Sequence, residues 1–329
     1  MRNRRVSGNL AQRSDYPLVG EQRQAQHLAP PPFRPSFLRR HARTLTIILS
    51  LAPALILIAV LFGASVVYGL AQSLGYLTVI GQETINLDAY RNVLIGPSVA
   101  ANEFWPALGF SLWVSAASTI LSAIGALLLT LLPSRRRGGK MSLLALNLNL
   151  AFPHLVWAIG LSLLLAQSGL IARFAALFGL IDTPADFPVF IRDRYGIGII
   201  LNYVTKELPF LALIVLAILR SQPEGYDLVA ENLGASRWQR VRYVTLPLVM
   251  PGLIAGSLLV FAFVFGAYEV PAVLGVRFPR MLSVLSLEFF LNPDLRSRAE
   301  GMAISVIMAL VVLTVAGVAQ YISARRRTA

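Results

Sequence analysis

Long apolar runs constrain this chain more than any other feature of its sequence. They include Thr44–Gly81 and Pro106–Arg135, the second ending just before its arginine, and neither contains a charged residue. A helix of about 20 mostly apolar residues is long enough to cross a bilayer. Four further runs meet this test: Met141–Ile171, Gly196–Leu219, Leu246–Val276 and Met302–Ala324. The sequence therefore predicts an all-α, polytopic membrane bundle of six transmembrane helices.

The charges are distributed unequally between the predicted connections. The formal net charge is +13, a value that in a soluble protein would suggest a nucleic-acid partner. Here 20 basic residues fall before Thr44, in the 2–3 and 4–5 connections and at the C-terminus, and eight fall in the other three connections. Because positive residues concentrate on the cytoplasmic side, we expect a multi-pass membrane protein with both termini cytoplasmic.

The two ends of the chain differ in composition from the apolar runs. Residues 1–43 are rich in Arg, Pro and Gln without apolar periodicity, which predicts a disordered, basic cytoplasmic tail. The tail either anchors the topology or contacts anionic lipid. The run after it is longer than the 7–15 residue core of a signal peptide. We thus expect a six-span domain over 44–324 and a basic cytoplasmic C-terminus over 325–329.

The 4–5 connection, residues 220–247, carries a regular pattern: RSQPEGYDLVAENLGASRWQRVRYVTLP. Ser221 and Glu224 have capping-box spacing, and Gly234 is suited to end the helix that follows. Ser236 and Gln239 form a second capping box before a helix over 237–245. The pattern predicts two short helices at the cytoplasmic surface.

Three interpretations of this connection compete. It is a solvated loop with incidental helicity, a DNA-binding helix-turn-helix, or a docking element that presents Trp238 to a groove of a cytoplasmic partner. A recognition helix tethered within a few residues of the membrane at each end could hardly enter a major groove. We therefore predict no nucleic-acid partner, and a membrane-anchored DNA regulator remains a distant third hypothesis for the whole chain.

The connection resembles the EAA loop of ABC-importer permeases. That pattern has a glycine, then ten residues later an aliphatic followed by x-Leu-Pro, and Gly234, Val244, Leu246 and Pro247 match it. The Glu-Ala-Ala at its start falls on 228–230, where only the alanine at 230 matches. The resemblance implies an ATPase-coupling loop made of Asp227, Ala230, Glu231, Gly234, Ala235, Ser236, Trp238, Val244, Leu246 and Pro247, with Asp227 or Glu231 in place of the missing glutamate.

Two further segments extend the resemblance. FAFVFGAYEVPAVLG (261–275) and the stretch 86–111 are similar to permeases for polyamines, iron(III), sulfate and thiamine, most of all to spermidine/putrescine permeases. The resemblance implies a subunit of the bacterial inner (plasma) membrane that forms half of a translocation path. Its implied partners are two cytoplasmic ATP-binding subunits, a second permease subunit (the same or a related chain), an extracytoplasmic substrate-binding protein and membrane lipid. The expected cargo is a polyamine or another small solute.

The chain lacks the residues of an ATPase or another enzyme. A phosphate-binding loop in SRRRGGK would need Gly at 134 and Ser or Thr at 141, where the chain has Ser134 and Met141. There is no cysteine, and the three histidines are widely spaced, which argues against a metal site. We predict no catalytic residues, no cofactor and no metal, and hence a non-catalytic subunit of an ATP-hydrolysing translocase.

Three charged residues lie inside predicted spans: Lys206, Glu207 and Glu269. Ionised groups at membrane depth are costly unless they are paired or hydrated. They form a structural network, Lys206 with Glu207 or Glu269, or they line the translocation path. An alternative function is an ion-coupled secondary transporter or channel that uses these three residues as a relay. For His154, beside Pro153, we expect helix packing or a bond to a carbonyl rather than catalysis.

Two features concern packing and the outer surface. Gly252 and Gly256 have the small-xxx-small spacing that lets helices approach closely. The outer connection 180–196 is long enough to receive a soluble binding protein, although a plain connector fits it nearly as well.

Overall fold

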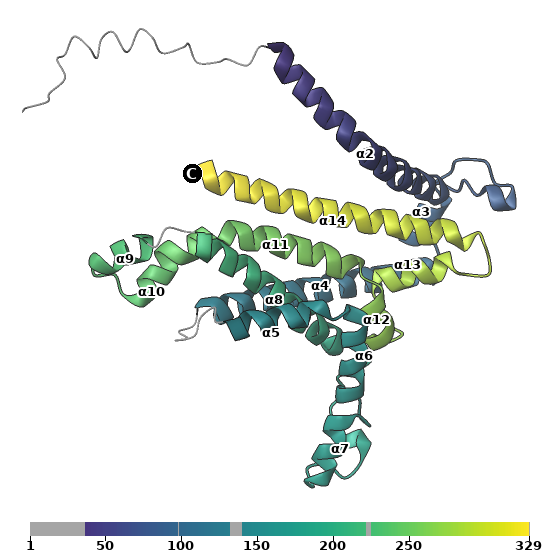
Figure 1. Cartoon of the computed structure of the whole chain (residues 1–329). Coiled ribbons are helices and arrows are strands. Elements are labelled where there is room, and N and C mark those ends of the chain that lie inside the picture. The colour runs from purple at the N-terminus through teal and green to yellow at the C-terminus, as the bar shows by residue number, and fades with distance from the viewer. Residues whose placement is uncertain (1–36, 98, 132–139, 222–224, 329) are drawn as a thin grey trace, which may run out of the picture. The chain divides into compact units, whose positions relative to one another are not determined.

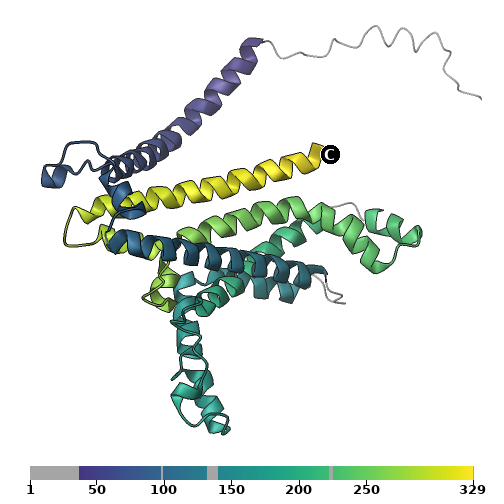
Figure 2. The same cartoon turned by 180° about the vertical axis from the view of Figure 1, so that it is seen from behind.

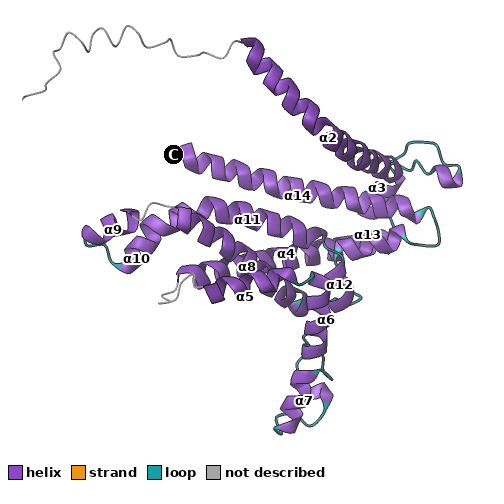
Figure 3. Cartoon of the chain, in the orientation of Figure 1, coloured by secondary structure: helices purple, strands orange, loops and turns teal. Residues whose placement is uncertain are grey.

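The computed structural model describes residues 37–97, 99–131, 140–221 and 225–328. Within these ranges it contains helices and no strand, apart from one isolated bridge between Leu77 and Gln82 (Figure 3). Six of its helical segments are long and apolar enough to cross a membrane. The prediction of an all-α, six-span bundle is therefore confirmed.

The helices fall into long and short elements (Figure 1). The long ones are α2 (Phe37–Ser73), α4 (Val99–Leu131), α5 (Lys140–Ala151), α6 (His154–Leu165), α8 (Ile197–Ser221), α11 (Leu246–Gly266) and α14 (Ser297–Thr328). The short ones are α3 (Asp88–Leu94), α7 (Leu170–Leu177), α9 (Gly225–Asn232), α10 (Arg237–Arg240), α12 (Glu269–Leu274) and α13 (Leu282–Phe290).

The chain divides into two units, Met1–Ala64 and Ser65–Ala329. The first unit is described from Phe37 as the greater part of α2, and its apolar side chains from Ile48 to Phe62 are largely exposed, as befits a helix surrounded by lipid. The predicted tail over 1–43 lies mostly outside the described residues, and α2 begins within it.

The second unit is built on three helices, α4, α8 and α11, which pack against one another in pairs (Figure 2). Their main core is apolar and includes Val114, Tyr203, Leu211, Val215 and Val264. A second core forms where α13 and α14 join α4 and α11, around Phe104, Phe261, Phe265, Leu285 and Ile304. The interior of the unit is thus the surface shared by the second, fourth, fifth and sixth spans.

The predicted third span, a single run over 141–171, is broken in the structure: α5 is a separate helix, and the segment long and apolar enough to cross a membrane is His154–Leu177. Helix α5 ends at Ala151 and α6 begins at His154, with Pro153 between them in extended conformation (φ −60, ψ 144). Proline has no N–H and clashes with the preceding turn, so the helix breaks there. Figures 1 and 2 both show α6 and α7 turning away from the bundle of α4, α8 and α11.

The fifth span also differs from the prediction of one run over 246–276. It ends at Gly266, and α12 begins anew at Glu269. At its other end, α10 continues through a π-helical turn (Val241–Thr245) into α11. The second short helix of the 4–5 connection is therefore continuous with the fifth span rather than separate from it.

The two glycines of α11 lie where α8 comes closest. A Cβ on Gly252 would lie 2.3 Å from Ile218 Cδ1, and one on Gly256 would lie 2.7 Å from Ile214 Cδ1. The predicted close approach of two helices is confirmed, and it joins the two spans that flank the 4–5 connection.

We expect Gly256→Leu to destabilise the protein by about 1–3 kcal/mol, because the added side chain overpacks the α8–α11 contact. Thermal unfolding of the detergent-solubilised protein measures the change. Gly109→Leu is the matched control, since a Cβ at Gly109 in α4 meets nothing within 4 Å. Equal melting temperatures for both variants would contradict the packing role.

Candidate functional site

The 4–5 connection forms a helical hairpin, α9–turn–α10, at one end of the second unit (Figure 1). Gly234 has φ +79 and ends α9. Its N–H donates to Glu231 O (2.9 Å), and the Ala235 N–H donates to Ala230 O (3.0 Å), which together satisfy two carbonyls at the helix end. The prediction that Gly234 ends the first helix in a left-handed conformation is confirmed.

The second helix of the hairpin starts with the predicted capping box. The Gln239 N–H donates to Ser236 Oγ (3.4 Å), and the Ser236 N–H donates to Gln239 Oε1 (2.7 Å). The first predicted capping box, between Ser221 and Glu224, falls on 222–224, outside the described residues. Of the two candidates for the missing glutamate, Asp227 lies in α9, but its side chain is also outside the described part.

Glu231, the other candidate, has a structural contact within the hairpin. Its Oε2 lies 2.5 Å from Arg240 Nη1. This ion pair ties the last turn of α9 to the end of α10, so the two helices form one unit. Glu231, considered from the sequence as a substitute for the family's glutamate, therefore braces the turn, and the glutamate's own position, 228, holds a leucine.

The surface of the hairpin is unusually apolar for a segment at the end of a span. Leu233 is 82% exposed and Trp238 is 70% exposed, and Val229 and Tyr243 are also exposed. A shallow groove of about 390 Å³ runs along the turn, and its lining combines Ala230, Leu233, Gly234, Ala235, Tyr243 and Val244 with the polar residues Gln239 and Arg240. Exposed apolar side chains gathered on one patch mark an interaction surface.

The end of the connection joins this surface rigidly to the membrane domain. Val244 lies in the π-helical turn, and Leu246 and Pro247 begin α11. No loop separates α10 from the fifth span, because backbone hydrogen bonding continues from Arg237 to Gly266. A displacement of the hairpin therefore moves α11 with it.

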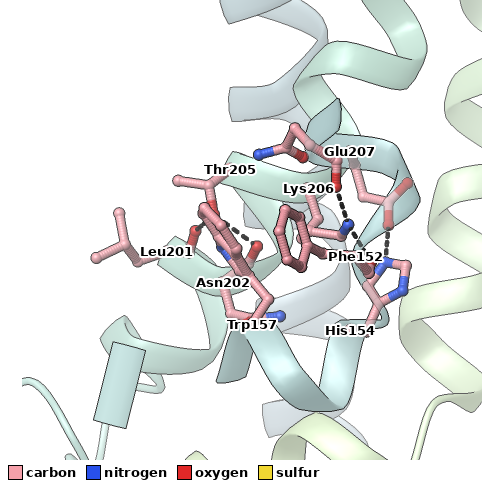
Figure 4. Close-up of polar contacts among 9 residues, drawn as sticks. Phe152, His154, Trp157, Leu201, Asn202, Thr205, Lys206 and Glu207 are labelled. Carbon is pink, nitrogen blue, oxygen red and sulfur yellow. Dashed lines mark hydrogen bonds and ion pairs between the residues drawn. The ribbon is translucent and has the colours of Figure 1, made fainter. Parts of the chain in front are cut away.

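A second group of functional candidates lies in the bundle, where α8 meets the break of the third span (Figure 4). The ammonium of Lys206 donates to Asn149 O (2.5 Å) and to Phe152 O (2.6 Å). The side chain is 1% exposed. The cation thus sits on the carbonyl end of α5.

The residues on either side of Lys206 contact the start of α6. The Trp157 Nε1–H donates to Thr205 Oγ1 (2.8 Å), and His154 Nε2 lies 2.8 Å from Glu207 Oε1. Neither network expected from the sequence forms among the described residues: Lys206 binds carbonyls in place of Glu207 or Glu269. His154 likewise binds a carboxylate rather than a carbonyl. Both differences arise because the Pro153 break places carbonyls and an imidazole beside α8.

Three rings from three helices meet beside Glu207. The centroid of His154 lies 4.9 Å from that of Phe263 and 6.3 Å from that of Tyr203, and Tyr203 and Phe263 meet edge-to-face at 6.3 Å. Phe263 is 44% exposed, whereas Tyr203 is fully buried. Glu269 is exposed and begins α12, which packs against both α6 and α8. The site therefore has aromatic faces and two carboxylates.

Sequence reasoning found the charges of this site but missed its rings and its geometry. Nothing in the spacing of Tyr203 and Phe263 distinguishes them from lipid-facing or core aromatics. Pro153 was the available signal, since a proline inside an apolar run marks a break where polar groups gather.

The opposite end of the second unit carries a charged cluster that the sequence did not indicate. Arg280 pairs with Glu103 (2.7 Å) and with Glu288, at the edge of a cavity of about 350 Å³. In the neighbouring connection over 180–196, the N–H and hydroxyl of Thr183 donate to Asp186, and these hydrogen bonds hold its pKa below the usual range. Both connections at this end are thus ordered by polar contacts.

Comparison with known proteins places the chain in a family. The family described as "Binding-protein-dependent transport system inner membrane component" matches residues 122–329, so the chain belongs to it. It is 31% identical over 212 residues to the inner membrane ABC transporter permease protein YnjC of Escherichia coli (strain K12), covering 63% of this chain and 40% of that protein. It is 30% identical over 218 residues to the molybdenum transport system permease protein ModB of Mycobacterium tuberculosis (strain ATCC 25618 / H37Rv), covering 64% and 77%.

The extent of these matches varies. The chain is 32% identical over 174 residues to YdcU, another inner membrane ABC transporter permease protein of Escherichia coli (strain K12), and spans 56% of it. Among solved structures, a bacterial ABC transporter involved in the import of the acidic polysaccharide alginate has a TM-score of 0.71 at 18% identity, covering 88% of this chain and 98% of the matched chain. That likeness confirms the fold. By its family the chain is an inner membrane component of a binding-protein-dependent transport system, and it spans about half the length of YnjC and YdcU.

Proposed function

We propose that this chain forms half of the translocation path of an ATP-driven importer and couples to a separate ATPase through the hairpin at 220–247. The hairpin carries the proposal. It presents Leu233, Trp238 and Tyr243 to solvent beside a groove, and it continues without a break into the fifth span. An exposed apolar patch on a helix that continues into a membrane span can bind a soluble partner and transmit its movement to that span.

The partners that go with this function are two ATP-binding subunits, a second permease subunit and an extracytoplasmic binding protein. A related solved structure is described as a bacterial alginate ABC transporter in complex with an alginate pentasaccharide-bound periplasmic protein. We place the binding protein of this chain at the end opposite the hairpin, on the connections around Arg280 and 180–196. The chain itself is the non-catalytic subunit, and ATP hydrolysis belongs to its partner.

Loss of the left-handed turn should release the ATPase. An L-residue with φ near +79 costs about 1–2 kcal/mol, and a Cβ at Gly234 meets nothing within 4 Å. Gly234→Ala should therefore weaken retention of the ATPase through backbone strain alone, and Gly234→Trp should weaken it further by adding bulk to the patch. Gly234→Asn should retain it, because Asn tolerates this conformation.

The measurement is the amount of ATPase subunit that co-purifies with each tagged variant from a strain that expresses the whole transporter. Gly109→Ala, on an exposed part of α4, serves as the control. Full retention by Gly234→Trp would contradict the coupling role of the hairpin.

We propose that the hairpin and both termini lie in the cytoplasm, because the basic residues of the sequence concentrate on their side of the membrane. The chain has no cysteine, so a single Leu233→Cys variant reports one site without a background reaction. A membrane-impermeant maleimide should label it in inverted vesicles and leave it unlabelled in intact spheroplasts. Asn292→Cys, between α13 and α14, should give the opposite result. Labelling of Leu233→Cys in spheroplasts would overturn the proposed orientation.

For the cargo, we propose a polyamine or another small organic cation. Glu207 and Glu269 supply negative charge, and the half-exposed face of Phe263 offers cation–π contact. The ammonium of Lys206 is solvated by the carbonyl end of α5 but keeps its positive charge, and the two carboxylates of Glu207 and Glu269 outnumber it. An ion-coupled transporter working alone explains these charges less well, because Lys206 occupies the carbonyls that an ion would need.

Neutral variants test this cargo. Glu207→Gln and Glu269→Gln should each lower spermidine uptake at least about fivefold while the ATPase still assembles, since each carboxylate acts on a partly desolvated cation. Phe263→Leu should raise the KM for spermidine about 2- to 30-fold, equivalent to about 0.5–2 kcal/mol of cation–π contact.

The control is Phe265→Leu, on the same helix but in the second core. Uptake is measured in cells that express the complete transporter, with and without an ion uncoupler at constant ATP. Normal uptake by both glutamine variants would remove these carboxylates from the path.

A further inference from the structure

The break in the third span leaves backbone carbonyls without their usual donors. In an unbroken helix the carbonyl of Asn149 would accept from the N–H of residue 153, but Pro153 has none. The chain also turns at Pro153 into extended conformation, which separates the carbonyl of Phe152 from the turn of α6. A carbonyl without a donor inside a membrane costs several kcal/mol.

The ammonium of Lys206 supplies a hydrogen-bond donor to both of these carbonyls. It binds the carbonyls of Asn149 and Phe152 at 2.5 and 2.6 Å, at the end of α5 where the helix dipole is negative. The buried cation and the orphaned carbonyls each need the other, since either alone would be uncompensated. Lys206 thus replaces the hydrogen bond that proline removes.

The neighbouring residue acts on the other side of the break. His154 is the first residue of α6, and Glu207 binds it at 2.8 Å. Two consecutive residues of α8 therefore hold the end of one half-helix and the start of the next, and Figure 4 shows both contacts converging on the break. The position of α8 therefore sets the angle between α5 and α6.

Helix α8 also leads to the hairpin. From Glu207 it continues to Ser221, about 21 Å at 1.5 Å per residue, and the hairpin follows. Pro209 lies within α8 just past the contacts, and its missing N–H weakens the helix near Thr205. On the other side of the break, α6 packs against α12, which begins with Glu269.

We propose that the break between α5 and α6 is a hinge and that Lys206 is its positioning residue. By holding Asn149 and Phe152, it sets the place of His154, Glu207 and α12, and it transmits the movement of α8 to them. The proposal rests on the proposed transport function for its transport assay, whereas its stability assay stands without it.

The test is a double-mutant cycle between Lys206 and Pro153. Lys206→Met removes the charge and donors at similar volume, so the melting temperature of the purified full-length protein should fall by several degrees. Pro153→Ala restores an N–H for Asn149, so Lys206→Met should cost much less in that background. Lys206→Arg should keep most of the stability, because it keeps donors and charge.

A transport assay distinguishes a hinge, which must move during import, from a contact that only stabilises the fold. The double variant Lys206→Met/Pro153→Ala should recover stability but still import spermidine at least about tenfold more slowly than the wild type. The reason is that it lacks both the helix break and the contact of Lys206 with it. The ATPase should co-purify normally with every variant, which shows that the coupling hairpin is intact. Loss of the ATPase from the wild type would instead count against the proposed function.

Two controls match the changes. Lys140→Met alters the other lysine of the chain, and Pro251→Ala alters a proline inside α11; neither should reproduce the loss or the recovery. Unchanged stability of Lys206→Met, or equal cost in both proline backgrounds, would refute the capping role. Recovery of stability and transport together would refute the hinge.

Discussion

The demand that every backbone polar group in hydrocarbon find a partner governs this structure. The chain meets it in most places with continuous helix, as in α4, α8 and α14. Where Pro153 breaks the third span, the ammonium of Lys206 on α8 supplies the missing hydrogen-bond donors instead. The location of the intramembrane charges follows from that constraint, since Lys206 is tolerated because it binds carbonyls and Glu207 because it binds His154.

Continuous helices and close helix packing connect the two candidate functional regions, the hairpin and the third-span break. The hairpin joins α11 without a loop, and α8 and α11 pack closely through Gly252 and Gly256. A force applied to the hairpin therefore reaches both spans, and one of them, α8, carries the contacts to the third-span break. Rigid helices joined at a few defined breaks are what a transport subunit needs in order to convert a surface movement into a change deep in the membrane.

Local signals in the sequence predicted much of this well. The long apolar runs predicted the six spans, and Gly234, Ser236 and Gln239 predicted the turn and cap of the hairpin, because these features depend on neighbouring residues alone. The boundaries were less accurate. Apolarity does not reveal that Pro153 breaks the third span or that α10 continues into α11, since both the breaks and the continuous segments are equally apolar.

By itself, the sequence determined the fold class, the number of spans and the form of the hairpin. These features depend on the length of each apolar run and on the capping residues, which are contiguous in the chain. The tertiary structure alone decided which partner each intramembrane charge has. Lys206 lies next to Glu207 in the chain, but consecutive helical residues point about 100° apart, and their partners lie 53 to 57 residues away in the sequence. Such pairings depend on how α5, α6 and α8 pack, which no local pattern encodes.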